Sequence, residues 1–238
     1  MDETPTPLKG LLLVDKPAGW TSFDVVNYVR KFVAAHDGKK PKNTKVGHTG
    51  TLDPFATGLL VLLVGKDYTR RAGEFSKLDK VYEATMKLGQ ASTTGDPEGE
   101  ITSLEDAKVP TQEQLEVACA AFVGEIEQVP PSYSAIKVDG QRAYKLARAG
   151  KEVIIEPRKT TINSLKVTSY EYPEAKIEVD VSSGTYIRTL VEDIAKELGT
   201  GAYTTELRRT SVGNFKINKS IQIDNLNTEL IIQNLQPL

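Results

Sequence analysis

The chain has 238 residues, of which 39% are hydrophobic and 26% are charged, and its formal net charge is −2. This composition can supply one substantial core or two small ones without covalent cross-links. A single cysteine excludes an intrachain disulfide, and two histidines exclude a Cys/His cluster of the kind that holds structural zinc. We expect no metal and no cofactor. No apolar stretch approaches the length of a membrane span, and we expect a cytoplasmic protein that does not associate with membranes.

Local patterns predict the first elements of the chain. Residues 1–9 are acidic and contain proline, so we expect a short disordered lead. Residues 11–14 predict a buried strand. Thr21 and Asp24 then match a capping box, and apolar residues recur at helical spacing behind them, which predicts a helix from about residue 22 to 34.

The rest of the chain continues to mix strands and helices. The unbroken apolar run 59–64 predicts a strand buried on both faces. Alternation or helical spacing predicts strands at 81–88 and 177–181, and helices at 111–122, 140–150 and about 190–198. Because the chain shows no repeat and no convincing linker, residues 10–238 are predicted to form one mixed α+β domain.

One acid, Asp53, lies in a glycine-rich loop of residues 45–58, directly before the strand 59–64, which we call the aspartate loop. Glycines at 47, 50 and 58 permit close backbone approaches, and Pro54 biases Asp53 towards an extended conformation. We therefore expect the carboxylate to be held in one orientation. A tight structural turn and an active site both fit this pattern, and the turn is the commoner origin of such a loop.

Two other charged positions have competing interpretations. Arg188 falls at the start of the helix predicted near 190–198, where the helix dipole disfavours a cation, so either an anionic partner lies nearby or the arginine is simply exposed. Asp96 lies within a Gly/Pro turn and is expected to shape that turn rather than to take part in chemistry.

The positive charges are unevenly distributed. Between residues 137 and 151 there are five basic residues and one acid. Nucleic-acid binding depends on such local potential rather than on the total charge, although many charge clusters are only solvated faces. The five are Lys137, Arg142, Lys145, Arg148 and Lys151.

The residues around Asp53, 47–60, closely resemble the catalytic-aspartate motif of the TruB family, whose members are tRNA pseudouridine synthases. Further segments resemble motifs of this family in the same order, at 15–22, 80–84, 130–135, 183–188 and 207–209. The resemblance spans residues 11 to about 215. It implies a pseudouridine synthase fold, with a central mixed or antiparallel β-sheet flanked by helices and loops, and isomerisation of the T-loop uridine of tRNA (position 55 by convention) to pseudouridine.

The resemblance also implies the catalytic residues. Asp53 takes the central role, either by covalent attack or by acting on a ribose proton, and the sequence does not choose between these routes. Arg188 matches an arginine that pairs with the catalytic aspartate, and such pairing would keep Asp53 ionised and oriented. Tyr82 matches a tyrosine placed against the flipped-out base.

Three further residues are implied to bind the substrate. Tyr186 matches a tyrosine beside the arginine, and Leu207 matches an apolar wall of the base pocket. His48 matches the residue that fills the space left by the extruded nucleotide. Lys16 and Pro17 match a motif whose implied role is structural, to buttress the aspartate loop.

Residues from about 124 to 151 resemble a thumb-like insertion of the family that clamps the tRNA T-arm. The residues implied to contact the RNA backbone are Lys137, Arg142, Lys145, Arg148 and Arg208. The family commonly continues into a small C-terminal RNA-binding domain, and we expect no separate domain of this kind here. We expect tRNA as the partner and no obligate protein partner. A binding module that remodels tRNA without catalysis, and a nucleosidase that releases uracil, remain as alternatives.

Overall fold

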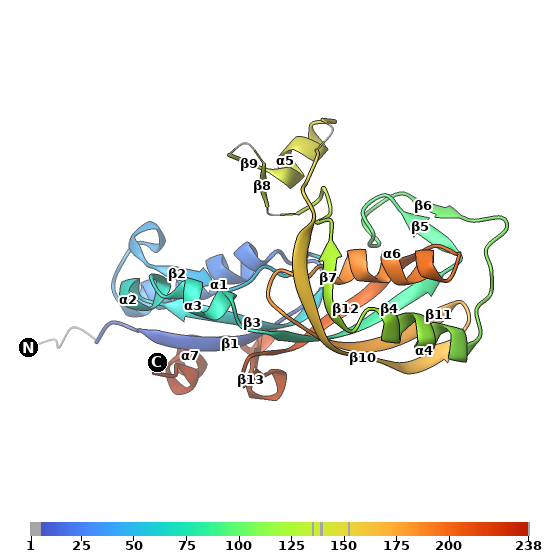
Figure 1. The fold of residues 1–238 in the computed structure, drawn as a ribbon. Coiled ribbons are helices and arrows are strands. Elements are labelled where there is room, and N and C mark those ends of the chain that lie inside the picture. The colour runs from blue at the N-terminus through green and yellow to red at the C-terminus, as the bar shows by residue number, and fades with distance from the viewer. Residues whose placement is uncertain (1–5, 135, 139, 152, 238) are drawn as a thin grey trace, which may run out of the picture. The chain divides into compact units, whose positions relative to one another are not determined.

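The computed structural model describes residues 6–134, 136–138, 140–151 and 153–237 (Figure 1). Its contacts divide the chain into two compact units, which are described separately. Unit 1 comprises residues 1–81 and 208–238, and unit 2 comprises residues 82–207. Both units combine helices with β-strands, and unit 1 contains both parallel and antiparallel strand pairs, so the predicted α+β class is confirmed. The prediction of a single catalytic domain remains a prediction.

The strands of unit 1 follow the order β14-β1-β3-β12, with β2 also pairing with β3 and β13 with β12. Strand β1 (Gly10–Lys16) runs antiparallel to β3 (Thr57–Val64), from the pair Gly10↔Val64 to Lys16↔Gly58. The predicted strands at 11–14 and 59–64 are therefore confirmed, and both are longer than predicted. The other strands are β2 (Val46–His48), β12 (Ala202–Val212), β13 (Phe215–Lys216) and β14 (Ile221–Gln222). The boundary between the units falls within β12, of which residues 208–212 belong to unit 1.

Both faces of the β1/β3 pair are covered, because successive side chains of a strand point to opposite sides. Leu60 and Leu62 pack with the apolar side of α1 (Ser22–His36) and with residues after 220. Leu59 and Val61 pack on the other side, against α3 (Ala72–Ser76) and Phe215. The capping box of Thr21 and Asp24 is present at the start of α1, as predicted. The shorter helices of unit 1 are η1 (Pro41–Asn43), α2 (Lys66–Thr69), η2 (Ile217–Lys219), η3 (Ile223–Asn225) and α7 (Thr228–Asn234).

The strands of unit 2 follow the order β12-β4-β11-β10-β7, with α4 packed on β10 and α6 beside α4 (Figure 1). Strand β10 pairs antiparallel with β11 and with β7. The predicted strands at 81–88 and 177–181 and the predicted helices at 111–122 and 190–198 are confirmed. The elements are β4 (Lys80–Leu88), β5 (Gln90–Ser92), β6 (Ile101–Ser103), α4 (Gln112–Ala121), β7 (Gly124–Gln128), β10 (Arg158–Glu171), β11 (Glu174–Val181) and α6 (Ile187–Glu197).

Strand β4 departs from strict alternation at Thr85. Tyr82, Ala84, Met86 and Leu88 are buried, as the pattern predicts. Thr85, which the pattern places on the polar face, is also buried. Its hydroxyl donates to Glu206 Oε2 at 3.0 Å, so a long-range polar partner satisfies the hydroxyl there.

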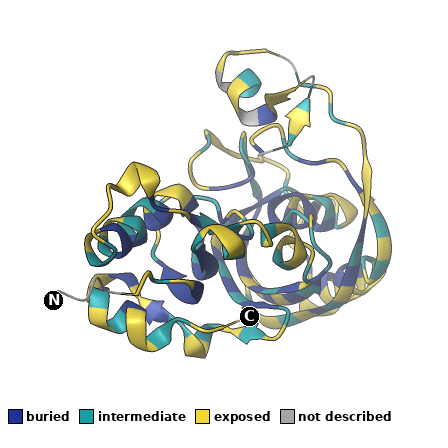
Figure 2. Ribbon diagram, turned by 90° about the vertical axis from the view of Figure 1, so that its left-hand side faces the viewer, coloured by how far each residue is buried: buried dark blue, intermediate teal, exposed yellow. Residues whose placement is uncertain are grey.

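The predicted insertion contains the hairpin β8 (Lys137–Val138) and β9 (Gln141–Arg142) and the helix α5 (Ala143–Arg148). We call residues 137–151 the clamp segment; it projects from the other elements of unit 2, and most of its described residues are exposed (Figures 1 and 2). The predicted helix at 140–150 is present but shorter, because β9 occupies its expected start. Arg142 is consequently the N-cap and does not continue a helical stripe, and the side chain of Arg148 lies outside what the structure describes.

Residues 1–5 of the predicted disordered lead lie outside the described residues, and residues 6–9 form no helix or strand. The backbone N–H of Leu8 nevertheless donates to Asp37 Oδ1 at 2.9 Å, and its side chain packs against the unit 1 core. Within the described ranges, no helix is long and apolar enough to cross a membrane.

Candidate active site

The loop that carries Asp53 belongs to unit 1, and its backbone is fixed on the N-terminal side of the aspartate. The Ser22 hydroxyl donates to the carbonyl of Leu52 at 3.0 Å and accepts the N–H of the same residue at 2.8 Å. Both Ser22 and Leu52 are buried, so these bonds are shielded from water. Ser22 is the first residue of α1, which places the start of this helix directly against the loop.

The backbone is also fixed on the C-terminal side of Asp53. The carbonyl of Pro54 accepts hydrogen bonds from Lys16 Nζ at 3.2 Å and from the N–H of Gly19 at 2.8 Å. Lys16 is 0% exposed, and its ammonium also donates to the carbonyls of Pro17 and Trp20. The buttressing role predicted for Lys16 therefore has a direct structural basis. Because the residues on both sides of Asp53 are held, the half-buried aspartate has a defined backbone position.

His48 lies in β2, just before this loop, and is half-buried. Burial, and after it the positive charge of Arg209, lower the pKa of the imidazole below its usual value, so the ring is neutral near pH 7. Its buried Nδ1 has no hydrogen-bond partner among the described residues. A neutral ring suits the predicted role in RNA positioning better than service as a general acid.

Arg188 lies in unit 2, at the second residue of α6, and is only 3% exposed. Its Nη1 donates to Asp96 Oδ2 at 3.0 Å and to the carbonyl of Thr94 at 2.7 Å, and its Nη2 donates to the carbonyl of Tyr133 at 3.0 Å. The interpretation as an exposed arginine is wrong, and an anionic partner is present, as a cation at this helix end led us to expect.

Asp96 shapes its turn as expected, because its carboxylate accepts from the N–H of Glu98 and from the Thr94 hydroxyl. It also forms the buried ion pair with Arg188, which we did not predict when we assigned Asp96 to the turn alone. The helix-dipole argument that requires an anion near Arg188 was the available signal for this pair.

Tyr186 is the N-cap of α6, and its backbone is fixed by a side chain from β7. Gln128 Nε2 donates to the carbonyl of Tyr186 at 3.0 Å, and Gln128 Oε1 accepts the N–H of Tyr186 at 2.9 Å. Tyr82 and Leu207 are buried on the neighbouring strands β4 and β12. The sequence did not indicate Gln128.

The predicted site residues thus fall into two sets. Asp53 and His48 belong to unit 1, whereas Tyr82, Tyr186, Arg188 and Leu207 belong to unit 2. The predicted pairing of Arg188 with Asp53 and the substrate contacts of the tyrosines remain predictions.

The residues predicted to contact the RNA backbone are of two kinds. Arg208 belongs to unit 1, and its guanidinium donates to both carboxylate oxygens of the buried Asp15, at 3.2 and 2.6 Å. This ion pair occupies much of its hydrogen-bonding capacity. The three remaining described side chains, which we call the clamp cations, are exposed on the clamp segment; they are Lys137, Arg142 and Lys145.

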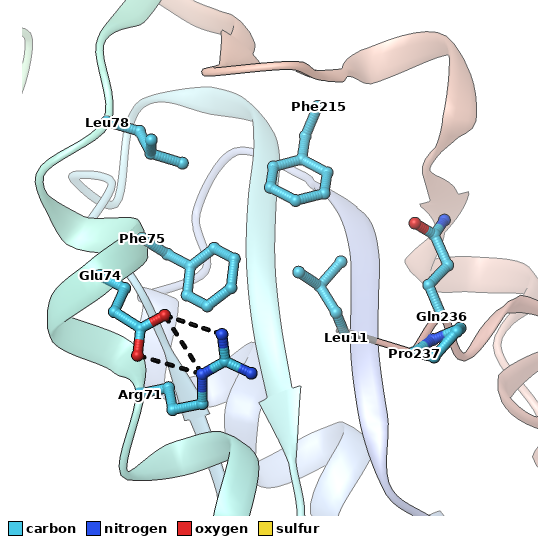
Figure 3. A pocket seen from close by; sticks show the side chains of 8 residues that line it. All are labelled: Leu11, Arg71, Glu74, Phe75, Leu78, Phe215, Gln236 and Pro237. Carbon is cyan, nitrogen blue, oxygen red and sulfur yellow. Dashed lines mark hydrogen bonds and ion pairs between the residues drawn. The ribbon is translucent and has the colours of Figure 1, made fainter.

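A cavity of about 440 Å³ lies within unit 1 (Figure 3). Phe75 and Phe215 line it together with Leu11 and Leu78, and the ion pair of Arg71 and Glu74 also lines it. None of the predicted site residues lines this cavity, which is therefore separate from the candidate chemistry. Among the described residues, no three His, Cys, Asp or Glu side chains are grouped so that they could hold a metal ion.

The chain is similar to known proteins in both sequence and fold. Residues 39–187 match the family model described as TruB family pseudouridylate synthase (N terminal domain), and residues 188–236 match the tRNA pseudouridylate synthase B C-terminal domain. The tRNA pseudouridine synthase B of Thermobifida fusca is 44% identical over 234 residues, which cover 95% of this chain and 77% of that protein. The protein of the same name from Pseudomonas fluorescens Pf-5 is 44% identical over 219 residues, covering 92% of this chain and 68% of that protein.

Two solved structures are similar in fold. A chain in the crystal structure of a Cbf5-Nop10-Gar1 complex aligns with a TM-score of 0.70 and 27% identity, over 96% of this chain and 60% of that one. A chain of an H/ACA RNP bound to a substrate RNA containing 2′-deoxyuridine aligns with a TM-score of 0.64 and 28% identity, over 91% of this chain and 52% of that one. This chain therefore spans only between half and two thirds of those solved chains.

Proposed function

Because the chain belongs to the TruB family of pseudouridylate synthases, we propose that it converts the T-loop uridine of tRNA, position 55 by convention, to pseudouridine. Its enzyme class is that of the pseudouridine synthases, which are isomerases. The observation that carries the proposal is the family motif around Asp53, on a loop whose backbone is held on both sides of the aspartate.

The proposed reaction breaks the bond between ribose C1′ and uracil N1, turns the base, and forms a bond between C1′ and uracil C5. C5 loses its hydrogen and N1 gains a proton, so the reaction has no net redox change. The Asp53 carboxylate either attacks C1′ covalently or removes a ribose proton after the glycosidic bond weakens. Fixing the loop supports both routes, because an effective nucleophile or base must be held near the reacting atom.

Arg188 is proposed as the counter-ion that keeps Asp53 ionised. Its support is that the guanidinium is buried and held in place by Asp96 and by the carbonyls of Thr94 and Tyr133. An arginine fixed in this way is pre-organised to bind a second carboxylate oxygen with little loss of side-chain freedom. The ion pair with Asp96 thus supports the proposed role and does not compete with it.

The base is proposed to leave the RNA stack before it reacts. Tyr82 is assigned to contact the flipped uracil and to take part in catalysis, while Tyr186 and Leu207 complete the base pocket. His48 is assigned to occupy the space that the base leaves. The reciprocal bonds between Gln128 and Tyr186 support a fixed position for Tyr186.

The proposed substrate contact is the tRNA T-arm. The clamp cations are exposed and suit contacts to phosphates, which supply affinity but little sequence information. Specificity would then come from the shape of the loop and its splayed bases. The proposal places the enzyme in the cytoplasm with its tRNA substrate and requires no protein partner.

The test uses the wild type, Asp53→Asn and the control Asp67→Asn, which removes an exposed carboxylate of α2. Each protein is incubated with an unmodified tRNA transcript, pseudouridine is mapped by carbodiimide-dependent primer-extension stops, and tRNA affinity is measured in parallel. We expect one T-loop stop with the wild type and Asp67→Asn, and none with Asp53→Asn at similar affinity.

Other results would reject the proposal. Tight binding without a stop in any sample would identify a non-catalytic binding module. Release of free uracil would identify hydrolysis.

A further inference from the structure

Arg209 is buried inside unit 1, where it spans the two ends of the aspartate loop. The residue is 1% exposed, and its backbone on β12 lies opposite Gly58 of β3. Nε donates to the carbonyl of Leu59 at 2.8 Å, Nη2 donates to that of Gly50 at 3.1 Å, and Nη1 donates to that of Thr51 at 3.4 Å. One guanidinium therefore joins the start of the loop to the strand that follows it.

The charge of Arg209 has no carboxylate partner in the described part of the chain. In that part of the chain the guanidinium of Arg209 donates its hydrogen bonds to backbone carbonyl oxygens. Burying a cation is costly when no anion accompanies it, and a neutral side chain of similar length would fill the same space at a smaller desolvation cost. A full positive charge at this point of the loop therefore suggests a use for the charge itself.

The positive charge of Arg209 affects the pKa of two neighbouring groups. Burial is the larger cause of the lowered pKa of His48, and the charge of Arg209 is the second. Burial is also the larger cause of the lowering of the Lys80 pKa to about 8; the charge of Arg209 adds to this lowering and Asp79 opposes it. The Lys80 ammonium donates to the carbonyls of Ser76 and Leu78. A Cβ placed on Gly50 would lie 3.6 Å from both Lys80 Cε and Arg209 Nη1, so both cationic side chains adjoin the loop at Gly50.

We propose that Arg209 is a positioning residue for Asp53. It ties the carbonyls of Gly50 and Thr51 in the aspartate loop to that of Leu59 in β3, and together with Lys80 it supplies positive potential that adds to the proposed counter-charge of Arg188 in keeping the carboxylate ionised. The inference rests on the proposed function of Asp53. Its geometric part complements the bonds made by Ser22 and Lys16, so that backbone groups of Gly50, Thr51, Leu52 and Pro54 all have buried partners. Its electrostatic part rests on the position of both cationic side chains beside Gly50, three residues before Asp53, because a cation near an acid favours the charged form of that acid.

Arg209→Met and Arg209→Lys separate these two parts. In Arg209→Met we expect amides of the peptide 46–60 to exchange at least about tenfold faster, because the loop opens more often. We expect kcat for tRNA to fall about 10- to 100-fold with KM within about twofold of the wild type. The acid limb of the kcat profile should move to higher pH, because Asp53 loses a stabilising charge.

In Arg209→Lys the charge remains, but one ammonium cannot span three separated carbonyls. We therefore expect faster loop exchange and a lower kcat, with the acid limb at its wild-type position. The matched control is Arg71→Met, which removes an exposed guanidinium paired with Glu74 in the same unit and should leave all three readouts unchanged.

Wild-type loop exchange and an unmoved acid limb in Arg209→Met would overturn the inference, and so would a loss confined to KM. If Arg209→Met does not fold, Arg209→Lys decides: wild-type loop exchange in that variant would refute the positioning role. The exchange measurement needs no activity. A wild type that makes no pseudouridine would therefore refute the proposed function while the hold of Arg209 on the loop is still tested.

Discussion

Ser22→Ala should loosen the aspartate loop without touching the aspartate. The substitution removes one oxygen atom, which makes two hydrogen bonds to the backbone of Leu52, at 2.8 and 3.0 Å. Both residues are buried, so the N–H and the carbonyl of Leu52 lose their partners away from solvent. A buried polar group left unpaired costs about 1–3 kcal/mol, and with some relaxation we expect a total loss of about 2–4 kcal/mol.

The assay is urea unfolding at pH 7, combined with the initial rate of pseudouridine formation. Ser76→Ala is the matched control, because it removes a single hydrogen bond from an exposed serine of unit 1 to the carbonyl of Gly73. That control should stay within about 0.5 kcal/mol of the wild type. Leu52 adjoins Asp53, and a misplacement near 1 Å costs up to about 100-fold in rate, so kcat should fall in Ser22→Ala and not in the control.

A stability loss in Ser22→Ala no larger than that of Ser76→Ala, with an unchanged kcat, would contradict the predicted role of the Ser22 hydroxyl. It would mean that Ser22 does not set the position of the loop. A stability loss with an unchanged kcat would retain the hydrogen-bond argument but remove its link to the chemistry.

Three further outcomes are expected. The pKa of Lys80 is about 8 in the folded protein and ordinarily 10.5, so the unfolded chain binds more protons between these two pH values. The free energy of unfolding of the wild type, relative to that of Lys80→Met, should therefore rise over this pH range by at most roughly 3 kcal/mol. Parallel curves of unfolding free energy against pH for the two proteins would contradict this. Gly58→Ala should lose more than about 3 kcal/mol of stability, because φ is +108° and a Cβ would lie 2.4 Å from the Arg209 carbonyl oxygen. Gly50→Ala, whose Cβ would have no contact closer than 3.6 Å, should lose under about 1 kcal/mol, and equal stability losses of the two variants in thermal unfolding would refute the steric argument. Replacing the clamp cations with alanine should reduce the slope of log affinity for tRNA against log salt by about 2–3, and an unchanged slope would exclude the clamp segment from the RNA interface.

Local patterns predicted the elements whose stability is decided locally. The capping box at Thr21 uses residues three apart, and the run 59–64 is apolar because both faces of β3 are covered. Strand β10 (Arg158–Glu171) was not predicted, because register shifts near Asn163 and Thr168 interrupt its alternation. Burial of Thr85 depends on Glu206, 121 residues away, which no local pattern contains.

The candidate site shows the same division. The family motif indicated Asp53 and Arg188, but the groups that hold them are distant in sequence. Ser22 lies 30 residues from Leu52, Gln128 lies 58 from Tyr186, and Asp96 lies 92 from Arg188. No local pattern distinguished Arg209 within the motif 207–209, although the fold buries it and bonds its guanidinium to carbonyls of the aspartate loop. Supporting contacts of this kind arise only when segments distant in sequence come together in the fold, so composition and periodicity carry no signal for them.

The most direct test of the central claim is release of tritium from tRNA labelled at uracil C5, because C5 loses its hydrogen only when the base is re-attached through that carbon. We expect the wild type and Asp67→Asn to release one tritium per tRNA, and Asp53→Asn to release none at comparable tRNA affinity. We expect no release from a transcript with cytidine in place of the T-loop uridine. Release by Asp53→Asn at the wild-type rate would contradict the role of the carboxylate, and release from the cytidine transcript would contradict the T-loop assignment.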